Sequence, residues 1–264
     1  MKMKGKRVIA GILLVGILAV TLAGCKNTGE NKKETEKPVI TLGSDSYPPY
    51  TYLNEDGVPT GIDVELATEA FRRMGYQVEP VQINWEKKKE LLKNAKERVK
   101  IHTPYIICND MMYNTWKEIA ERVPDFSIMT NSVANNGNPF GSADYARNRN
   151  RILNTGIDIW EYEGGYSYHG KSILIDDDLS VIGSFNMDMR STYLDTELML
   201  VIRSKEINKQ LEEGMMEYER VSRQVLEDGT YRDPYHVEPI ELTKKRQRNI
   251  LLVQHLLGWA RYLF

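Results

Sequence analysis

The stretch Tyr168–Glu197, YHGKSILIDDDLSVIGSFNMDMRSTYLDTE, decides the fold that this sequence predicts. It contains a histidine, a lysine and an aspartate in the pattern H-x-K-x-x-x-x-D, at His169, Lys171 and Asp176. The run KSILID predicts a strand, and LSVIG at Leu179–Gly183 predicts its hairpin partner. We therefore expect polar groups to gather at one end of a buried hairpin. Three further polar side chains follow the hairpin, at Ser184, Asn186 and Glu197.

The side chains of this stretch suit chemistry on a phosphodiester. Residues two apart in a strand share a face, so His169 and Lys171 are expected to point the same way. The turn at Ser184 is expected to bring its hydroxyl and the Asn186 amide beside them. The imidazole supplies a nucleophile or base, while the other groups donate hydrogen bonds to phosphoryl oxygens. Glu197 is expected to accept the second ring N–H and so to fix the imidazole tautomer.

The pattern H-x-K-x4-D followed by G-S-x-N resembles the signature of the phospholipase D superfamily. Supporting pieces are TNS at Thr130–Ser132, IDIWEY at Ile157–Tyr162 and GSFNMDMRS at Gly183–Ser191. From about residue 93 to the C-terminus, the chain is similar to the C-terminal half of a bacterial cardiolipin synthase-like member. The resemblance implies an α/β fold with a mixed sheet flanked by helices, and a phosphatidyltransferase or phosphodiesterase that acts on phospholipid.

The resemblance also implies a role for each residue of the motif. His169 would attack phosphorus to form a phosphohistidine, or protonate the leaving alcohol, and a second alcohol or water would release the phosphatidyl group. The family uses no metal and no other cofactor, and the sequence shows no cysteine and histidine spacing typical of a metal site. The remaining roles would be to hold the phosphoryl oxygens, for Lys171, Ser184 and Asn186, and to support the local geometry, for Asp176 and Glu197.

The family reaction needs two such histidines that face each other, and this chain contains one H-x-K motif. Either two chains pair their motifs across a two-fold axis, or the polypeptide is inactive. A two-fold interface uses one surface patch twice, which makes symmetric pairing favourable. The sequence therefore predicts a homodimer for any active form.

Composition narrows the class of partner. The chain has 264 residues with 41% hydrophobic residues, enough for one large domain or two small ones. Its formal net charge is −2 and its pI is near 6.2, so no global basic field indicates a nucleic-acid partner. A single-motif nuclease remains an alternative that this charge disfavours.

The N-terminus predicts export. Four basic residues precede an uncharged apolar run, Val8–Ala23, and the sequence LAGC ends at Cys25. This order resembles a bacterial lipobox, which implies lipidation of Cys25 and a location on the extracytoplasmic face of the cell membrane. An uncleaved anchor is the alternative. Residues 26–38 are polar and without periodicity, so they are expected to form a solvated tether.

The segment at residues 39–92 predicts a β-α-β unit. Strands are expected at Val39–Gly43 and Tyr76–Ile83, and the helix between them has apolar residues at Ile62, Leu66, Ala70 and Phe71. The amino-acid sequence of this segment is similar to the start of an amino-acid-binding lipoprotein of an ABC importer. That resemblance makes Tyr47, Tyr50 and Tyr52 candidates for solute contact, with packing of the turn as the alternative.

The solute-binding resemblance ends near Leu92, and a cleft with one wall cannot bury most of a ligand. An amino-acid-binding lipoprotein and an inactive fusion of two half-domains therefore remain alternatives to an enzyme. The expected organisation is a lipoprotein signal peptide at residues 1–25, a tether at 26–38, a truncated solute-binding-protein lobe of periplasmic type at 39–92 and a phospholipase D-like domain at 93–264.

Three further expectations concern Cys108 and two segments in the second half of the chain. Cys108 lies in an apolar run and is expected to be buried. Glu206–Glu227 predicts one charged helix with a solvated face. Thr243–Phe264 has a basic front and an aromatic end, which suits either an interfacial helix on anionic lipid, and thus a membrane contact, or ordinary core packing.

Overall fold

The computed structural model describes residues 39–44, 46–82, 94–195, 197 and 199–263. The predicted signal peptide, the tether and Cys25 lie outside the described residues. So do residues 83–93, where the solute-binding resemblance was expected to end. In the described part of the chain, no helix combines the length and the apolar character needed to cross a bilayer.

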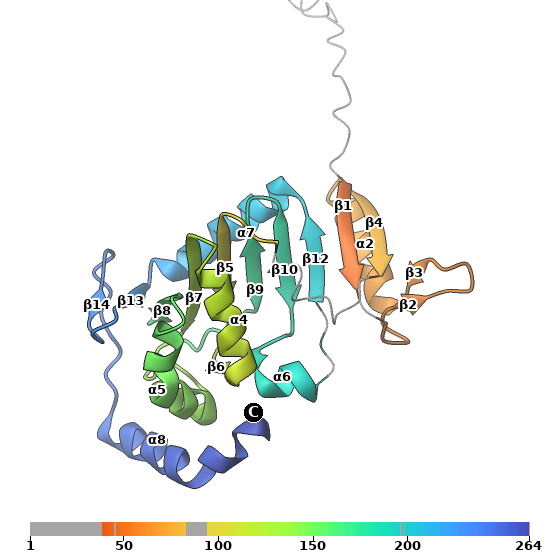
Figure 1. Cartoon of the computed structure of the whole chain (residues 1–264). Helices are drawn as coiled ribbons and strands as arrows, with labels where there is room; N and C mark the ends of the chain where they lie inside the picture. The colour runs from red at the N-terminus through yellow and green to blue at the C-terminus, as the bar shows by residue number, and fades with distance from the viewer. Residues whose placement is uncertain (1–38, 45, 83–93, 196, 198, 264) are drawn as a thin grey trace, which may run out of the picture. The chain divides into compact units, whose positions relative to one another are not determined.

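A ten-stranded mixed sheet runs through the described residues (Figure 1). Two short pairs lie outside it, β2 (Tyr52–Leu53) with β3 (Pro59–Thr60) and β6 (Ile106–Ile107) with β11 (Met187–Asp188). In spatial order, the strands of the large sheet are β14 (Tyr231–Arg232), β13 (Ser222–Val225), β8 (Asp158–Tyr162), β7 (Asp125–Asn131), β5 (Arg98–His102), β9 (Ser172–Ile175), β10 (Leu179–Gly183), β12 (Met199–Arg203), β1 (Val39–Ser44) and β4 (Gln77–Gln82).

The predicted fold class, a mixed α/β sheet flanked by helices, is confirmed. β5, β7 and β8 pair in parallel, while β9 and β10 form the predicted antiparallel hairpin and pair with β5 and β12. The helices are α2 (Ile62–Arg73), α4 (Asp110–Ala120), α5 (Pro139–Leu153), α6 (Met189–Tyr193), α7 (Lys205–Glu219) and α8 (Lys244–Leu257), followed by the 3-10 helix η2 (Gly258–Leu263).

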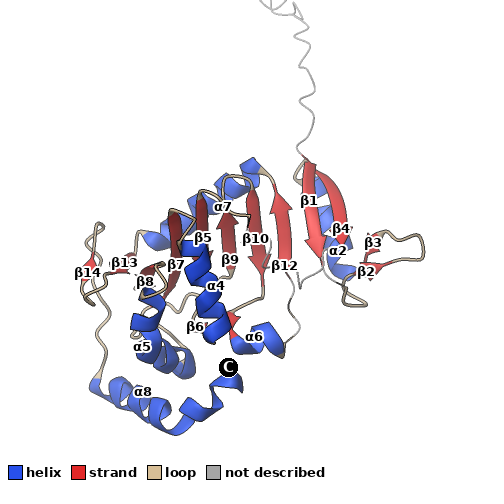
Figure 2. Cartoon of the chain, in the orientation of Figure 1, coloured by secondary structure: helices blue, strands red, loops and turns tan. Residues whose placement is uncertain are grey.

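Alternating side chains on β5 explain why helices cover both faces of the sheet. Ile101 points into the main core, which also contains Trp116 of α4. Lys100 and His102 point towards α7, where each lies 3.0 Å from a carboxylate oxygen of Glu219. Figure 2 shows α4 and α7 on opposite faces accordingly. The core is therefore apolar on the α4 side and partly ionic on the α7 side.

The prediction of one charged, solvated helix at Glu206–Glu227 was wrong. The helix α7 ends at Glu219, and Ser222–Val225 continues as strand β13, which pairs with β8. The inner face of α7 is buried at Ile207, Asn208 and Met215. Two of its charged residues, Glu212 and Glu219, form ion pairs with Arg98 and Lys100 of β5, while the other charged side chains of the helix are exposed.

The N-terminal segment forms the predicted β-α-β unit and extends the large sheet. β1 pairs in parallel with β4 and antiparallel with β12, so the sheet continues across the boundary expected between residues 92 and 93. Two of the apolar residues noted in the helix α2, Ile62 and Leu66, are exposed. Val64 is the buried residue of this helix, and Phe71 packs against the small core beneath it.

Replacing Ile40 tests the attachment of β1. Ile40 is fully buried with Tyr76, Ile202 and Ile207. We expect Ile40→Ala to lower the free energy of unfolding by about 2–4 kcal/mol, because it leaves a cavity in this cluster. Val39→Ala, at a half-exposed neighbour, should change it by less than about 0.5 kcal/mol. Urea denaturation of both variants provides the measurement, and equal small effects would contradict the pairing of β1 with β12.

Candidate active site

His169 lies in the loop between β8 and β9 and lines a pocket of about 290 Å³. The imidazole is exposed, so a ligand that enters the pocket can reach it. Three separate loops contribute to the walls. The other lining residues are Pro104, Tyr105, Asn136, Gly137, Asn138 and Ser167.

Lys171 holds the His169 side chain from one side. Its Nζ lies 3.0 Å from Nδ1 and 3.3 Å from Nε2 of the ring, and it donates to the His169 carbonyl at 2.8 Å. The two side chains therefore share a side of the chain, as the spacing predicted. Partial burial, and then the charge of Lys171, lower the pKa of His169 below its usual value. At neutral pH the imidazole is thus neutral and able to act as a nucleophile.

The turn after β10 brings the second group of predicted residues to Lys171. The Gly183 N–H donates to the Lys171 carbonyl at 3.2 Å, which places Ser184 beside this strand end. The Ser184 hydroxyl donates to the carboxylate of Glu197. Burial lowers the pKa of the Lys171 ammonium, while the charge of Glu197 opposes that shift. The Glu197 carboxylate accordingly acts on Ser184 and Lys171 here, and the contacts of the His169 ring are with Lys171.

Asn186 lies in the same turn with its side chain fixed. Its backbone N–H and its Nδ2 both approach the Ser191 hydroxyl, at 3.2 and 3.3 Å. Ser191 in turn lies in the first turn of α6, which Asp188 caps by accepting from the Ser191 N–H. The short helix α6 thus positions the amide that was predicted to contact a phosphoryl oxygen.

Two residues near His169 had no place among the predicted site residues. The buried Asn131 side chain accepts from the Tyr168 N–H at 2.7 Å and donates to the Tyr168 carbonyl at 2.9 Å. A Cβ at Gly170 would lie 2.3 Å from the Tyr168 hydroxyl, so any larger residue between the histidine and the lysine would have to displace the Tyr168 ring. The role of Asn131 could have been inferred from the TNS stretch, since a polar side chain at the buried end of an apolar strand needs a hydrogen-bond partner.

The three N-terminal tyrosines lie apart from this pocket, on the segment around β2. Tyr47, Tyr50 and Tyr52 are all exposed, and the rings of Tyr47 and Tyr50 stack with centroids 5.5 Å apart. None of them lines the His169 pocket. Among the described residues, no group of three or more histidine, cysteine or carboxylate side chains is arranged to hold a metal ion.

A family model described as cardiolipin synthase, PLD-like domain, matches residues 89–218 and so includes every predicted residue of the motif. Residues 89–218 therefore resemble a phospholipase D-like domain. A second model, for bacterial extracellular solute-binding proteins of family 3, matches residues 40–106. Both resemblances that the sequence predicted are therefore confirmed.

Known relatives and a solved structure agree with this assignment. The cardiolipin synthase A of Yersinia pseudotuberculosis is 32% identical over 137 residues, which cover 51% of this chain and 27% of the relative. A protein of Helicobacter pylori described as uncharacterized is 28% identical over 156 residues, covering 54% and 30%. The matches thus span less than a third of each relative. The crystal structure of phosphatidylserine synthase from Haemophilus influenzae has the same fold, with a TM-score of 0.50 and 16% identity over 67% of this chain and 44% of that one.

Within residues 89–218, Asp176 lies at the other end of β9 from His169. The four-residue strand between them spans roughly 13 Å at about 3.3 Å per residue. Asp176 has a positive φ of 51°, and its carboxylate accepts from the backbone N–H groups of Lys96, Glu97 and Arg98 at 2.9–3.3 Å. Burial raises its pKa, but these three donors outweigh burial and hold the pKa below its usual value. The residue therefore fixes the start of β5 and does not touch the pocket.

Titration of His169 tests its environment. The His169 pKa is expected below 6.5, and Lys171→Gln should raise it because the variant removes a positive charge next to the ring. NMR titration gives both values, with the His169 signal assigned from its loss in His169→Asn. Lys205→Gln, at an exposed lysine paired with Asp177, serves as the control and should leave the pKa unchanged. An unchanged pKa in Lys171→Gln would refute the contact.

The position of Asp176 predicts a role in stability. Asp176→Ala should lower the free energy of unfolding by about 1–3 kcal/mol, because three N–H groups lose a charged acceptor. The folded pKa is depressed, so this contribution is present above the unfolded pKa of about 3.9 and is lost as pH falls through the folded value. Denaturation of wild type and variant at pH 7 and in acid measures the difference. Asp177→Ala, in the same turn but exposed, should have no measurable effect.

Proposed function

We propose that this protein is a phospholipase D-type phosphatidyltransferase or phosphodiesterase, cardiolipin synthase-like, that acts on phospholipid through a phosphohistidine at His169. The observation that carries the proposal is an exposed imidazole at the wall of a 290 Å³ pocket, with the Lys171 Nζ 3.0 Å from its Nδ1. Such a pair supplies a nucleophile together with a donor for the phosphoryl oxygens.

The reaction proceeds in two displacements at phosphorus. A nitrogen of His169 attacks, the N–P bond forms, and the P–O bond to the leaving alcohol breaks as that oxygen takes a proton from a general acid. An alcohol or water then attacks the phosphohistidine while the acid, now a base, accepts its proton, and the free imidazole returns. Lys171, Ser184 and Asn186 stabilise the charge that develops on the phosphoryl oxygens, and the proposed steps use side chains alone.

The general acid in this proposal comes from a second copy of the chain. The sequence holds one H-x-K motif, and His102 cannot substitute because it is buried beneath α7 against Glu219. His169 of the partner subunit would donate the proton across a two-fold axis. The proposal thus includes a homodimer as the active form.

Phospholipid is the proposed substrate, and the membrane is the proposed location. Similarity in sequence to cardiolipin synthase A, and in fold to phosphatidylserine synthase, supports this substrate class. Lipidation at Cys25, predicted from the sequence, would hold the protein on the extracytoplasmic face of the cell membrane. The net charge of −2 supports a lipid substrate over nucleic acid.

One observation favours a second function, amino-acid binding by the N-terminal segment. Residues 40–106 match a solute-binding family, and Tyr47 and Tyr50 form an exposed stacked pair. Calorimetry of the full chain against a panel of amino acids tests whether it binds an amino acid, and the absence of binding heat would contradict this second function.

The central prediction concerns His169. His169→Asn should abolish the release of free headgroup from phosphatidylglycerol, and the formation of cardiolipin from it, because His169 supplies the only imidazole among the described residues that line the pocket. His236→Asn provides a matched control at an exposed histidine with a positive φ that asparagine tolerates, and it should keep full activity. Wild-type activity in His169→Asn would disprove the proposed nucleophile.

Mixing the two forms tests the need for two histidines. If subunits exchange at random, the specific activity should fall as the square of the wild-type fraction, since every mixed dimer lacks one histidine. A linear fall would show that one chain is sufficient.

A further inference from the structure

The last helix, α8, and the 3-10 helix η2 expose a run of large apolar side chains. These two elements are the last of the described chain and pack beside α5. An exposed apolar surface of this kind is typical of an interaction site, because water is a poor solvent for it. The exposed fractions are 58% for Leu251, 55% for Leu252, 54% for Leu256, 73% for Trp259, 58% for Tyr262 and 44% for Leu263. We call these six residues the terminal apolar face.

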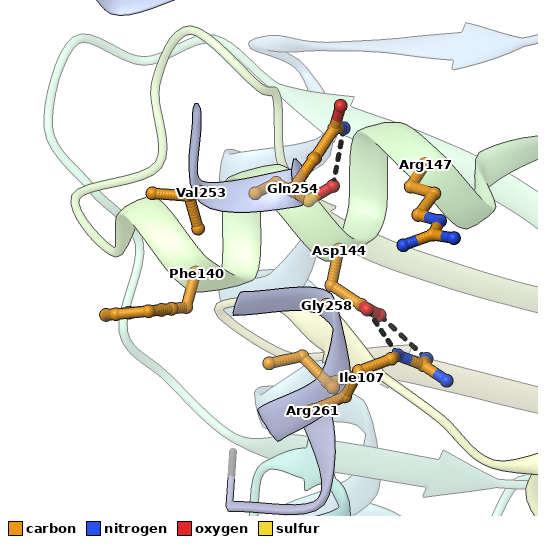
Figure 3. A pocket seen from close by; sticks show the side chains of 9 residues that line it. Ile107, Phe140, Asp144, Arg147, Val253, Gln254, Gly258 and Arg261 are labelled. Atoms are coloured by element: carbon orange, nitrogen blue, oxygen red, sulfur yellow. Dashed lines mark hydrogen bonds and ion pairs between the residues drawn. The ribbon is translucent and has the colours of Figure 1, made fainter. Parts of the chain in front are cut away.

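The opposite side of these helices is firmly attached, so the terminal apolar face has a defined direction. Figure 3 shows this attachment, where Gln254 Nε2 donates to the Ala143 carbonyl at 2.8 Å and Arg261 forms two bonds with Asp144 at 2.5 and 2.9 Å. Arg261 also donates to the Cys108 carbonyl at 2.9 Å. Ile250 and Ala260 are buried on the same side. The exposed side chains are therefore held outward while a different face of the helix packs on α5.

The start of α8 carries positive charge without any compensating negative charge on the same segment. Lys244, Lys245 and Arg248 are exposed, and Arg246 is partly buried. No aspartate or glutamate occurs between Leu242 and the C-terminal Phe264. The segment is thus basic in its first turns and apolar in its last turns and in η2.

We propose that α8 and η2 dock this protein onto an anionic lipid bilayer. The terminal apolar face enters the interfacial region, with Trp259 and Tyr262 at the boundary where amphipathic rings are favoured. Lys244, Lys245 and Arg248 meet the negative headgroups, each contributing while the surface potential is not screened. The helix lies at the surface, since 14 residues at 1.5 Å each extend only about 21 Å.

Charge argues against a second copy of the chain as the occupant. A two-fold contact places the same surface on both sides. Because the segment contains no acidic residue, such a contact would bring only like charges together around the apolar centre, which is unfavourable. An anionic bilayer complements both the apolar part and the basic part.

The basic start of α8 lies beside the wall of the His169 pocket. A second pocket, of about 360 Å³, is lined by Lys245 and Arg246 of α8 together with Asn136 and Gly137. The last two residues also line the pocket of His169. Arg246 donates to the Asn136 carbonyl, which joins the basic turn to the wall that both pockets share. The basic first turn of α8 therefore packs against the same Asn136–Gly137 wall that borders the His169 pocket.

Fluorescence quenching tests the proposal on the full chain. Phosphatidylglycerol vesicles with brominated acyl chains should quench the emission of Trp259, and Trp259→Phe should remove that quenched component. The substitution keeps an aromatic ring at an exposed position, so the fold should not change. The comparison is independent of the predicted lipid anchor, which both proteins carry, and of catalysis at His169. Equal quenching of wild type and Trp259→Phe would overturn the proposal.

Charge reversal provides the second arm. Lys244→Glu with Lys245→Glu should remove most of the Trp259 quenching on phosphatidylglycerol vesicles, as should replacing that lipid with phosphatidylcholine. Lys209→Glu, at an exposed lysine of α7, is the matched control and should quench like wild type. Unchanged quenching in the double variant and on phosphatidylcholine would contradict the role of anionic lipid.

A third measurement distinguishes docking onto a lipid bilayer from contact with a second copy of the chain. Leu252→Glu should reduce vesicle quenching and leave the mass in sedimentation unchanged, whereas Leu66→Glu, at an exposed leucine of α2, should change neither. A fall in mass with Leu252→Glu would assign this face to self-association and overturn membrane docking.

Discussion

The placement of His169 depends on one buried carboxamide, that of Asn131. This side chain lies at the end of β7 and holds both the N–H and the carbonyl of Tyr168, the residue directly before the histidine. Its Nδ2 also lies 2.7 Å from the Pro104 carbonyl. Because a buried amide left without partners is costly, the carboxamide ties two loops of the pocket to the sheet. The histidine can then remain exposed to a ligand while its backbone is fixed from behind.

Local patterns in the sequence predicted the hairpin and the pairing of His169 with Lys171. Both depend on alternation within a few residues, which a sequence displays directly. The position of Asp176 was not visible in that way. The spacing H-x-K-x4-D gives the number of residues between the histidine and the aspartate but not their separation in space, and the length of β9 lies between them. The carboxylate also accepts hydrogen bonds at the start of a strand some eighty residues earlier, which no local pattern shows.

The α7 face of the sheet shows where pattern reading fails for a different reason. A helix with few apolar positions predicts contact with water, yet Glu212 and Glu219 meet Arg98 and Lys100 of β5. Charged residues on both sides of an interface leave no hydrophobic periodicity to detect. The helix α2 shows the opposite case, since Ile62 and Leu66 have helical spacing but remain exposed. Only the tertiary partners decide which of two possible faces a short helix buries.

The continuation of the sheet by β1 and β4 has a consequence for how the protein behaves in a crowded solution. Without these strands, β12 would present a free row of backbone donors and acceptors, which invites another chain to add a strand. Instead, β1 occupies that row, and the outermost strand β4 contains Pro80, a residue without an N–H that is tolerated at a sheet edge. The segment that resembles a solute-binding protein thus covers an edge of the sheet that would otherwise be open to pairing with another chain.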